Sequence, residues 1–215
     1  MKKDDAVKII VSLVVALCLA ACSVVGRSEV EIAPYQVLKA DSSLDIEVRR
    51  YEPMILVSTS MVGDGRNNAF RKLFRYISGD NAGSNNIAMT APVLMAGESV
   101  NQGTKIAMTA PVFMSGANSE PRMAFVMPKH FTLDSTPKPT NPDLLVEEVR
   151  DYTVAAIRFS GTLSQRNVQR YSQQLQQWIT ANGHTAVSDP VTAGYNGPLT
   201  LPMLRRNEIL IEIRH

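Results

Sequence analysis

The sequence predicts an α+β domain built from two similar units, each with the order strand, strand, helix, strands. One observation is a repeat at an offset of 101 residues, since Val48-Arg49-Arg50-Tyr51 returns as Val149-Arg150-Asp151-Tyr152. The other is that, after each copy, the apolar spacing changes from that of a strand to that of a helix. Neither unit alone could bury both faces of its strands. We therefore expect the two antiparallel sheets to join into one curved sheet or partial barrel with the helices outside.

The first unit begins with two strands. Apolar residues alternate from Leu44 to Val48, and Met54 to Met61 is rich in β-branched and apolar residues. After a glycine-containing break the spacing becomes helical, with apolar side chains at Phe70, Leu73, Phe74 and Ile77. This pattern predicts an amphipathic helix from about Asn67 to Ser78, with Gly79 as its C-terminal stop.

A nine-residue motif is then written twice. Ile87–Met95 returns nineteen residues later as Ile106–Met114, with Leu94 replaced by Phe113. On a strand, each copy would offer one apolar face with two methionines. Methionine fills irregular apolar space or meets a variable ligand, and its preference for interiors favours a core role. Because proline cannot donate to a sheet, each copy must be an edge, a bulge or a strand end at Pro92 and Pro111.

The second unit follows a strand at Met123–Met127 and a proline-rich crossing at Pro128–Pro142, which we expect to separate the two halves. Its helix can be capped by Ser164 and ended by Asn182-Gly183. Two further strands are expected, one approaching Ala193-Gly194-Tyr195 and one at Glu208–Ile213.

The N-terminus has the pattern of an export signal. Lys2, Lys3 and Lys8 lie in the first eight residues. They are followed by an apolar run from Ile9 to Leu17, which is too short to span a bilayer comfortably. Leu19-Ala20-Ala21-Cys22 resembles a bacterial lipobox, so we expect residues 1–21 to be a signal peptide and Cys22 to carry lipid. A plain signal peptide or a retained anchor is the alternative. By resemblance to bacterial sorting rules, Ser23 favours the outer membrane.

These features predict a protein of the bacterial cell envelope that faces the periplasm. Residues 22–34 form a tether, and 35–215 form one domain of two pseudo-repeats, about 35–127 and 143–215. Removing the signal peptide lowers the formal charge from +2 to +1, which gives no electrostatic case for binding nucleic acid. With Cys18 removed and Cys22 modified, no cysteine pair remains for a disulfide or a metal site.

Motifs of enzymes are mostly absent. The chain has no Gly-x-Ser-x-Gly, phosphate-loop or His-Glu-x-x-His pattern, so no catalytic residue is predicted. The three histidines, His130, His184 and His215, lack the spacing of a metal site. Arg205-Arg206 lies beside a predicted strand, and arginine binds carboxylates through its planar fork. A solvated charge cluster is the other interpretation of this pair.

Several motifs in one order resemble the SOUL family of haem-binding proteins. They are Ile46-Glu47-Val48-Arg49-Arg50-Tyr51, the helix with Phe70, Leu73, Tyr76-Ile77 and Gly79, Ile87-x-Met89-Thr90-x-Pro92-Val93, Phe125-x-Met127-Pro128, and Thr192-Ala193-Gly194-Tyr195-Asn196 with Arg206-Asn207-Glu208. The resemblance implies duplicated β-β-α-β-β units that form a distorted antiparallel β-barrel flanked by two helices. It also implies tetrapyrrole binding in an apolar groove beside the first helix. Carried over by position, the site residues are Phe70, Phe74 and Arg75, with Arg205 or Arg206 as a propionate partner.

The chain departs from the family at one position. Some members have a histidine, proposed as an axial ligand, directly before the tyrosine of the first strand motif, whereas this chain has Arg50. We therefore expect reversible binding of haem or a related tetrapyrrole, held by apolar contacts and propionate pairing. An enzyme or chaperone-like factor acting on porphyrins is the alternative. A methionine-based copper site is a third, although Met89 and Met95 would lie about 20 Å apart on one strand and could not share a metal.

Overall fold

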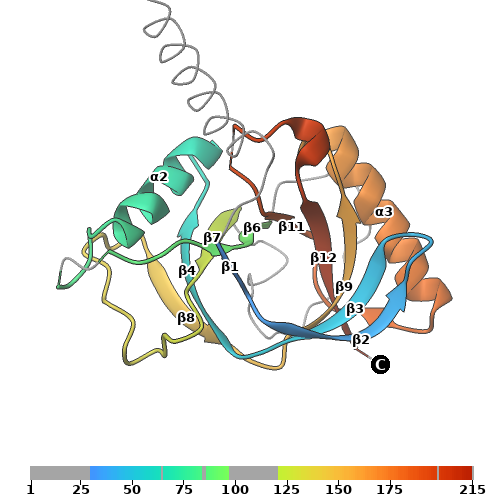
Figure 1. Ribbon diagram of the computed structural model, residues 1–215, viewed down its shortest axis with the longest axis horizontal. Coiled ribbons are helices and arrows are strands. Elements are labelled where there is room, and N and C mark those ends of the chain that lie inside the picture. The colour runs from blue at the N-terminus through green and yellow to red at the C-terminus, as the bar shows by residue number, and fades with distance from the viewer. Residues whose placement is uncertain (1–29, 64, 84–85, 97–120, 198, 215) are drawn as a thin grey trace, which may run out of the picture.

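Two helices flank a strongly curled antiparallel sheet. The computed structural model describes residues 30–63, 65–83, 86–96, 121–197 and 199–214. Helix α2 (Gly65–Ile77) and helix α3 (Gln165–Ala181) lie on the outside of the sheet, on opposite sides of the molecule (Figure 1). Both predicted helices are confirmed, and the first begins two residues earlier than its apolar spacing indicated.

Ten strands form the main sheet of the described residues, in the order β2-β3-β9-β12-β11-β6-β7-β4-β8, with β10 paired to β12. Their bounds are β2 Tyr35–Asp41, β3 Ile46–Tyr51, β4 Met54–Ser60, β6 Val93–Ala96, β7 Arg122–Val126, β8 Leu145–Val149, β9 Thr153–Phe159, β10 Thr185–Ala186, β11 Val191–Gly194 and β12 Asn207–Arg214. Two short strands, β1 (Glu31–Ile32) and β5 (Thr90–Ala91), pair in parallel beside it. The end strands β2 and β8 are not paired with each other, so the sheet forms a distorted half-barrel.

The strand order confirms the predicted duplication and adds an exchange. Strands β6 and β11 pair at the centre of the sheet. Outward from β6 lie β7 and then β4 of the first unit, and outward from β11 lie β12 and then β9 of the second unit. The first strand of each unit does not stay with its own unit. Strand β3 pairs with β9 of the second unit, and β8 pairs with β4 of the first. Each half of the sheet is therefore completed by a strand from the other half of the chain.

Helix ends follow the expected signals. The side chain of Ser164 accepts a hydrogen bond from the backbone N–H of Asn167 and so caps α3. Gly183 follows α3 with φ +75°, and Gly79 follows α2 with φ +110°. These left-handed conformations suit glycine, which has no Cβ to clash there. The boundaries of both helices are thus set by local sequence.

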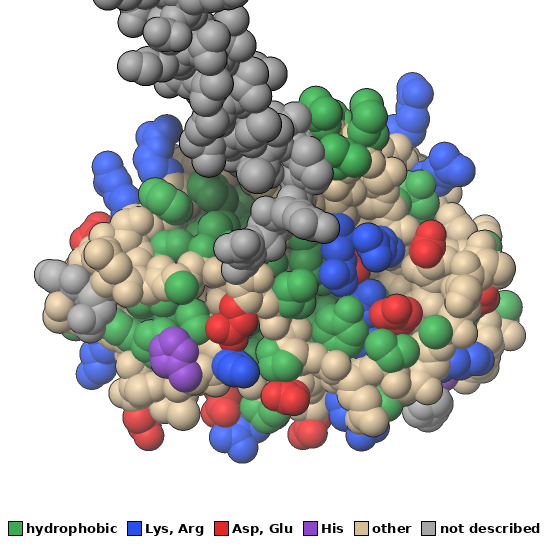
Figure 2. Space-filling model, viewed as in Figure 1, with side chains coloured by type: hydrophobic (Ala, Val, Ile, Leu, Met, Phe, Trp, Pro, Cys, Tyr) green, Lys and Arg blue, Asp and Glu red, His purple; other side chains and the backbone are tan. Residues whose placement is uncertain are grey.

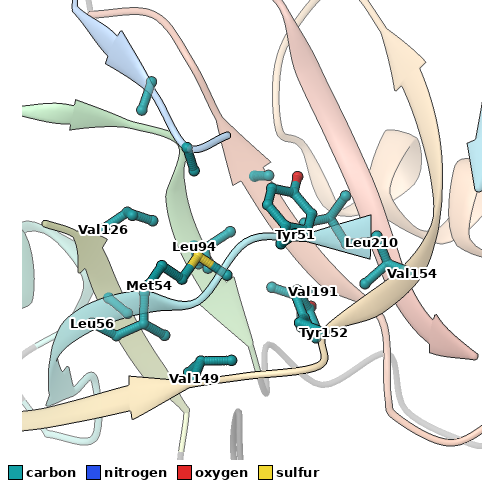
Figure 3. Packing of buried hydrophobic residues seen from close by; sticks show 14 of the residues in the cluster. Tyr51, Met54, Leu56, Leu94, Val126, Val149, Tyr152, Val154, Val191 and Leu210 are labelled. Carbon is teal, nitrogen blue, oxygen red and sulfur yellow. The ribbon is translucent and has the colours of Figure 1, made fainter. Parts of the chain in front are cut away.

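Three apolar cores hold the sheet and the helices together. The central core lies inside the curl and draws on both units, as Figure 3 shows for Tyr51, Leu94, Tyr152 and Leu210. A second core lies between α2 and strands β4 and β7, and a third between α3 and strands β9 and β12. The middle of the sheet is therefore buried on both faces. This explains why β4 is buried almost throughout, and why its first four residues are all apolar rather than alternating with polar ones.

The first copy of the doubled motif forms β5 and β6. The two strands are separated at Pro92, as expected for a residue that has no backbone N–H to donate to a sheet. Met95 is buried and Met89 packs against the same core beneath α2, which confirms the core role favoured for these methionines. The second copy, Ile106–Met114, and the lipidation candidate Cys22 lie outside the described residues. Residues 31–33, which the sequence assigned to the tether, pair with β5 or are buried against the domain.

Deleting residues 97–115 is expected to leave the fold intact and to raise the free energy of unfolding by about 1 kcal/mol. The first copy already fills the place between β11 and β7, and Ala96 pairs directly with Arg122. The deletion leaves residues 116–121 as a six-residue connection, and a shorter loop loses less entropy on closure. Urea unfolding of the deleted and parent chains measures the difference. A large loss of stability would show that the removed segment supports the fold.

Candidate functional site

An aromatic pair lies on the outer surface of α2. Phe70 and Phe74 are one helical turn apart, so their rings lie on the same face, with centroids 6.1 Å apart and planes at 13°. Their exposed fractions are 37% and 48%, which is high for phenylalanine. Beneath them, the edge of the Phe70 ring meets Phe125 of β7 at 5.4 Å, and Phe125 is fully buried. The pair is thus a supported, flat and solvent-accessible apolar surface.

This surface continues across the centre of the sheet. Phe125 is opposite Val93 of β6, and Val93 is opposite Gly194 of β11. Gly194 in turn lies beside Leu163, since a Cβ on this glycine would be in ordinary van der Waals contact with the Leu163 side chain at 3.7 Å. Figure 2 shows hydrophobic side chains gathered below α2 on this face. The row from Phe70 to Leu163 is therefore a continuous apolar strip, which we call the α2 surface.

Arg75 follows the aromatic pair in the last turn of α2. Its side chain is exposed, and it forms no ion pair with the described residues. One position along a helix turns a side chain by about 100°, so Arg75 projects away from the ring of Phe74. It can reach a ligand only at the margin of the α2 surface.

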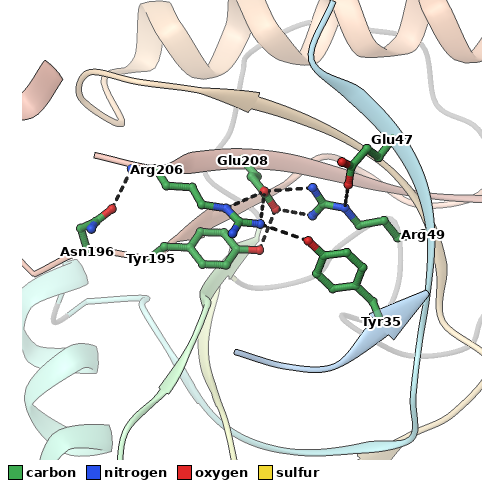
Figure 4. A network of polar contacts seen from close by, with 7 residues as sticks. All are labelled: Tyr35, Glu47, Arg49, Tyr195, Asn196, Arg206 and Glu208. Atoms are coloured by element: carbon green, nitrogen blue, oxygen red, sulfur yellow. Dashed lines mark hydrogen bonds and ion pairs between the residues drawn. The ribbon is translucent and has the colours of Figure 1, made fainter. Parts of the chain in front are cut away.

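Arg206, in contrast, belongs to a buried ionic network (Figure 4). Its Nη2 and Nε donate to Oε1 of Glu208 at 2.7 and 3.0 Å. Arg49 of β3 donates to both oxygens of the same carboxylate, at 2.7 and 3.1 Å, and the hydroxyl of Tyr195 donates to Oε2 at 2.7 Å. Arg49 also donates to Glu47 at 2.6 Å. The guanidinium of Arg206 is therefore already engaged with a carboxylate of its own chain.

The network is charged at neutral pH. Burial alone raises the pKa of Glu208, but hydrogen bonds and charge from Arg49, and then the charge of Arg206, hold it below its ordinary value. Burial raises the pKa of the Tyr195 hydroxyl, and Tyr51 and Glu208 raise it further, so Tyr195 stays a neutral donor. Burial, and then the charge of Glu208, raise the pKa of the Tyr51 hydroxyl as well. No described residue forms a hydrogen bond of good geometry with this hydroxyl.

The five predicted site residues fall into two groups. Phe70, Phe74 and Arg75 share α2, whereas Arg205 and Arg206 precede β12 in the other half of the sheet. Arg205 is half-buried and donates from Nε to the carbonyl of Thr200 at 2.8 Å. The sequence motifs contain Glu208 and Arg49 but did not indicate that Glu208 pairs with Arg206 or that Arg49 belongs to the same network. For Glu208 the available signal was that it adjoins the apolar run Ile209–Ile211, where a charge requires a partner in a folded core. Strand β3 carries three charged residues and gave no such signal for Arg49.

A family model described as "SOUL heme-binding protein" matches residues 30–102 and again 95–212. Together the two matches cover nearly all of the described chain.

The chain belongs to the SOUL family. No curated protein sequence matches it. The two matched segments together span both units of the sheet, and the predicted family and fold are both confirmed.

Solved structures share the SOUL-like fold at low sequence identity. An uncharacterized conserved protein from Listeria innocua has a TM-score of 0.53 at 10% identity, over 80% of this chain and 93% of that one. A hydrolase from Listeria innocua has 0.50 at 8%, over 80% and 92%. An EcmrR–DNA complex has 0.50 at 14%, over 79% of this chain and 57% of that chain. The TM-scores support a common fold, and at such low sequence identity they support no statement about function.

This SOUL protein brings no cluster of metal ligands together in the part of the chain that the structure describes. No group of three His, Cys, Asp or Glu side chains there could hold a metal ion. His130 packs against Phe131, and His184 packs against Trp178 near the end of α3. His215 lies outside the described residues. None of the described helices is long and apolar enough to cross a membrane.

Proposed function

We propose that this protein binds haem or a related tetrapyrrole reversibly on the α2 surface. The observation that carries the proposal is the exposed, stacked Phe70–Phe74 pair supported by Phe125, in a chain that belongs to a haem-binding family. A flat apolar macrocycle gains most from aromatic walls that are already held in place. Beside the pair, the half-buried Val93 and Gly194 extend this apolar area, while the buried Phe125 supports it from beneath.

The polar groups of the ligand have fewer partners than the sequence suggested. Arg75 at the margin of the surface, and Arg205 from the loop before β12, are the cations that we propose for its carboxylates. Arg206 could bind a ligand carboxylate only if its guanidinium were shared between that carboxylate and Glu208. With Arg50 at the position of the family's candidate ligand, the iron is weakly or variably ligated by protein. Bound haem supplies its own iron chemistry, and the side chains named here bind and orient it.

Haem titration followed by absorbance tests this proposal. We expect saturable binding with a Soret band that His130→Ala and His184→Ala leave nearly unchanged, because neither histidine lies on the α2 surface. Circular dichroism of the His184 variant controls for its packing against Trp178. A Soret band that shifts on loss of either histidine would reveal a protein ligand that the proposal omits, and an absence of saturable binding would refute it.

We propose further that lipid on Cys22 attaches the domain to the bacterial envelope, facing the periplasm and on the outer membrane. The lipobox-like sequence supports this, and Val30, where the described residues begin, already packs against the domain. Cys22→Ser is expected to give a folded protein that no longer fractionates with membranes. Cell fractionation measures this, and a variant that stayed with the membrane fraction or did not fold would contradict it.

A further inference from the structure

The connection between β11 and β12 is a firmly held loop, which we call the apical loop (residues 199–204). It contains a short 3-10 helix at Pro202–Leu204. The carbonyl of Pro202 accepts a hydrogen bond from the backbone N–H of Gly161 at 2.8 Å, which ties the loop to the connection before α3. Arg205 donates to the carbonyl of Thr200 at 2.8 Å, and the Thr200 side chain is buried. The loop therefore has a defined conformation.

This defined conformation turns four apolar side chains toward solvent. Leu199 is 80% exposed and Met203 is 71% exposed, while Leu201 and Leu204 are each exposed by more than a third. A single exposed leucine needs no explanation, but four within six consecutive positions form a contiguous apolar projection. Because hydrogen bonds hold the loop in place, the exposure of these four side chains is a feature of the folded structure.

The two helices carry only positive charge. Over α2 and α3 the sequence contains six Arg or Lys residues and no Asp or Glu. The whole chain, in contrast, has 22 basic and 20 acidic residues, so basic charge is concentrated on the helices. In Figure 1 the apical loop lies at the upper edge of the molecule, with the first turns of α2 and α3 reaching the same edge. Figure 2 shows Lys and Arg side chains on both sides of a hydrophobic projection there.

We propose that the apical loop inserts into the surface of an anionic lipid bilayer, with the basic faces of α2 and α3 contacting the headgroups on either side. Apolar side chains at the tip and cations at the flanks are the combination that binds proteins to the interface of anionic membranes. The charge of the helices favours this occupant over an uncharged apolar partner.

The length of the chain before the domain gives a second argument, which rests on the proposed lipid at Cys22. Seven residues, 23–29, separate Cys22 from Val30, and such a segment spans at most about 28 Å when extended. A domain confined this close to a bilayer meets it at high effective concentration, so a modest apolar loop is enough to orient the domain.

Vesicle co-sedimentation with the signal-free Cys22→Ser chain tests the loop independently of the lipid. We expect binding to vesicles of phosphatidylcholine with phosphatidylglycerol, weaker binding to phosphatidylcholine alone, and loss of binding at high salt. Leu199→Ser combined with Met203→Ser should weaken binding roughly tenfold or more. Arg166→Gln with Arg170→Gln in α3 should weaken it roughly tenfold on the anionic vesicles only.

Controls come from exposed leucines elsewhere on the surface. Leu133 and Leu145 are each about half exposed, outside the apical loop, so Leu133→Ser and Leu145→Ser should leave vesicle binding unchanged. Haem titration of the loop variants should also be unchanged, which separates failure of this proposal from failure of haem binding on α2. The proposal is overturned if the Cys22→Ser chain binds no vesicles, as it would if the loop served a protein partner. It is equally overturned if the loop variants bind as the parent does, or if the control variants lose binding as well.

Discussion

Glu208→Ala is expected to lower the free energy of unfolding by about 3 to 5 kcal/mol. The carboxylate is fully buried and is the shared acceptor of Arg49, Arg206 and Tyr195. Its removal leaves two guanidinium groups without their common counter-charge and one tyrosine hydroxyl without an acceptor. Denaturant unfolding at pH 7 measures the loss. A change below about 1 kcal/mol would mean that water or rearrangement replaces the network.

The duplication supplies a control within the same chain. Arg150 occupies the position in the second unit that Arg49 occupies in the first, but it is exposed and pairs with Glu148 on the surface. Arg49→Ala should therefore be strongly destabilising and Arg150→Ala nearly neutral. Equal effects of the two substitutions would show that burial of the network does not decide its contribution.

The contribution of Glu208 also has a predictable dependence on pH. Its pKa in the folded state lies below the ordinary value of 4.5, so its stabilisation is complete above that value and is lost as the pH falls through the folded pKa. Burial raises the pKa values of Glu147 and Glu212, which act in the opposite direction. The difference between the parent and Glu208→Gln, measured from pH 7 to pH 3, isolates the one carboxyl. That difference should shrink on acidification.

Phe70→Ala and Phe74→Ala are each expected to weaken haem binding roughly tenfold or more, and more than Arg75→Ala does. A charged hydrogen bond contributes about 1.5 to 3 kcal/mol when formed in a protected site, and Arg75 is exposed to solvent. An aromatic wall loses its whole contact area when truncated. Absorbance titration of the purified variants gives the affinities.

The second helix provides the matched control for this experiment. Tyr171 corresponds to Phe70 in the duplicated unit, and like Phe70 it packs on an aromatic ring beneath it, although it stacks on Phe159 with ring centroids 4.2 Å apart whereas Phe70 and Phe125 meet edge to face. Tyr171→Ala should leave haem affinity unchanged, since it removes a similar ring from the other half. Unchanged affinity in Phe70→Ala and Phe74→Ala, or a loss with Tyr171→Ala, would move the site away from α2.

Local patterns in the sequence were enough to predict both helices, the duplicated units and the family. Helix α3 is an example, since its cap at Ser164 and its end near Gly183 depend on neighbouring residues. The exchange of β3 and β8 could not be predicted, because an apolar strand pattern does not specify which strand pairs with it. Similarly, the partner of Arg49 could not be predicted. Arg49 and Glu208 are 159 residues apart, and only the pairing of β3, β9 and β12 brings them together.

The exchange of β3 and β8 gives the molecule the form of a strand-swapped dimer whose two chains have become one. The crossing at residues 128–142 is the peptide that joins them. In a true dimer such an exchange would be held by association and would weaken on dilution. Here the covalent connection keeps each donated strand at a fixed, high local concentration, so the completed sheet is independent of how dilute the protein becomes.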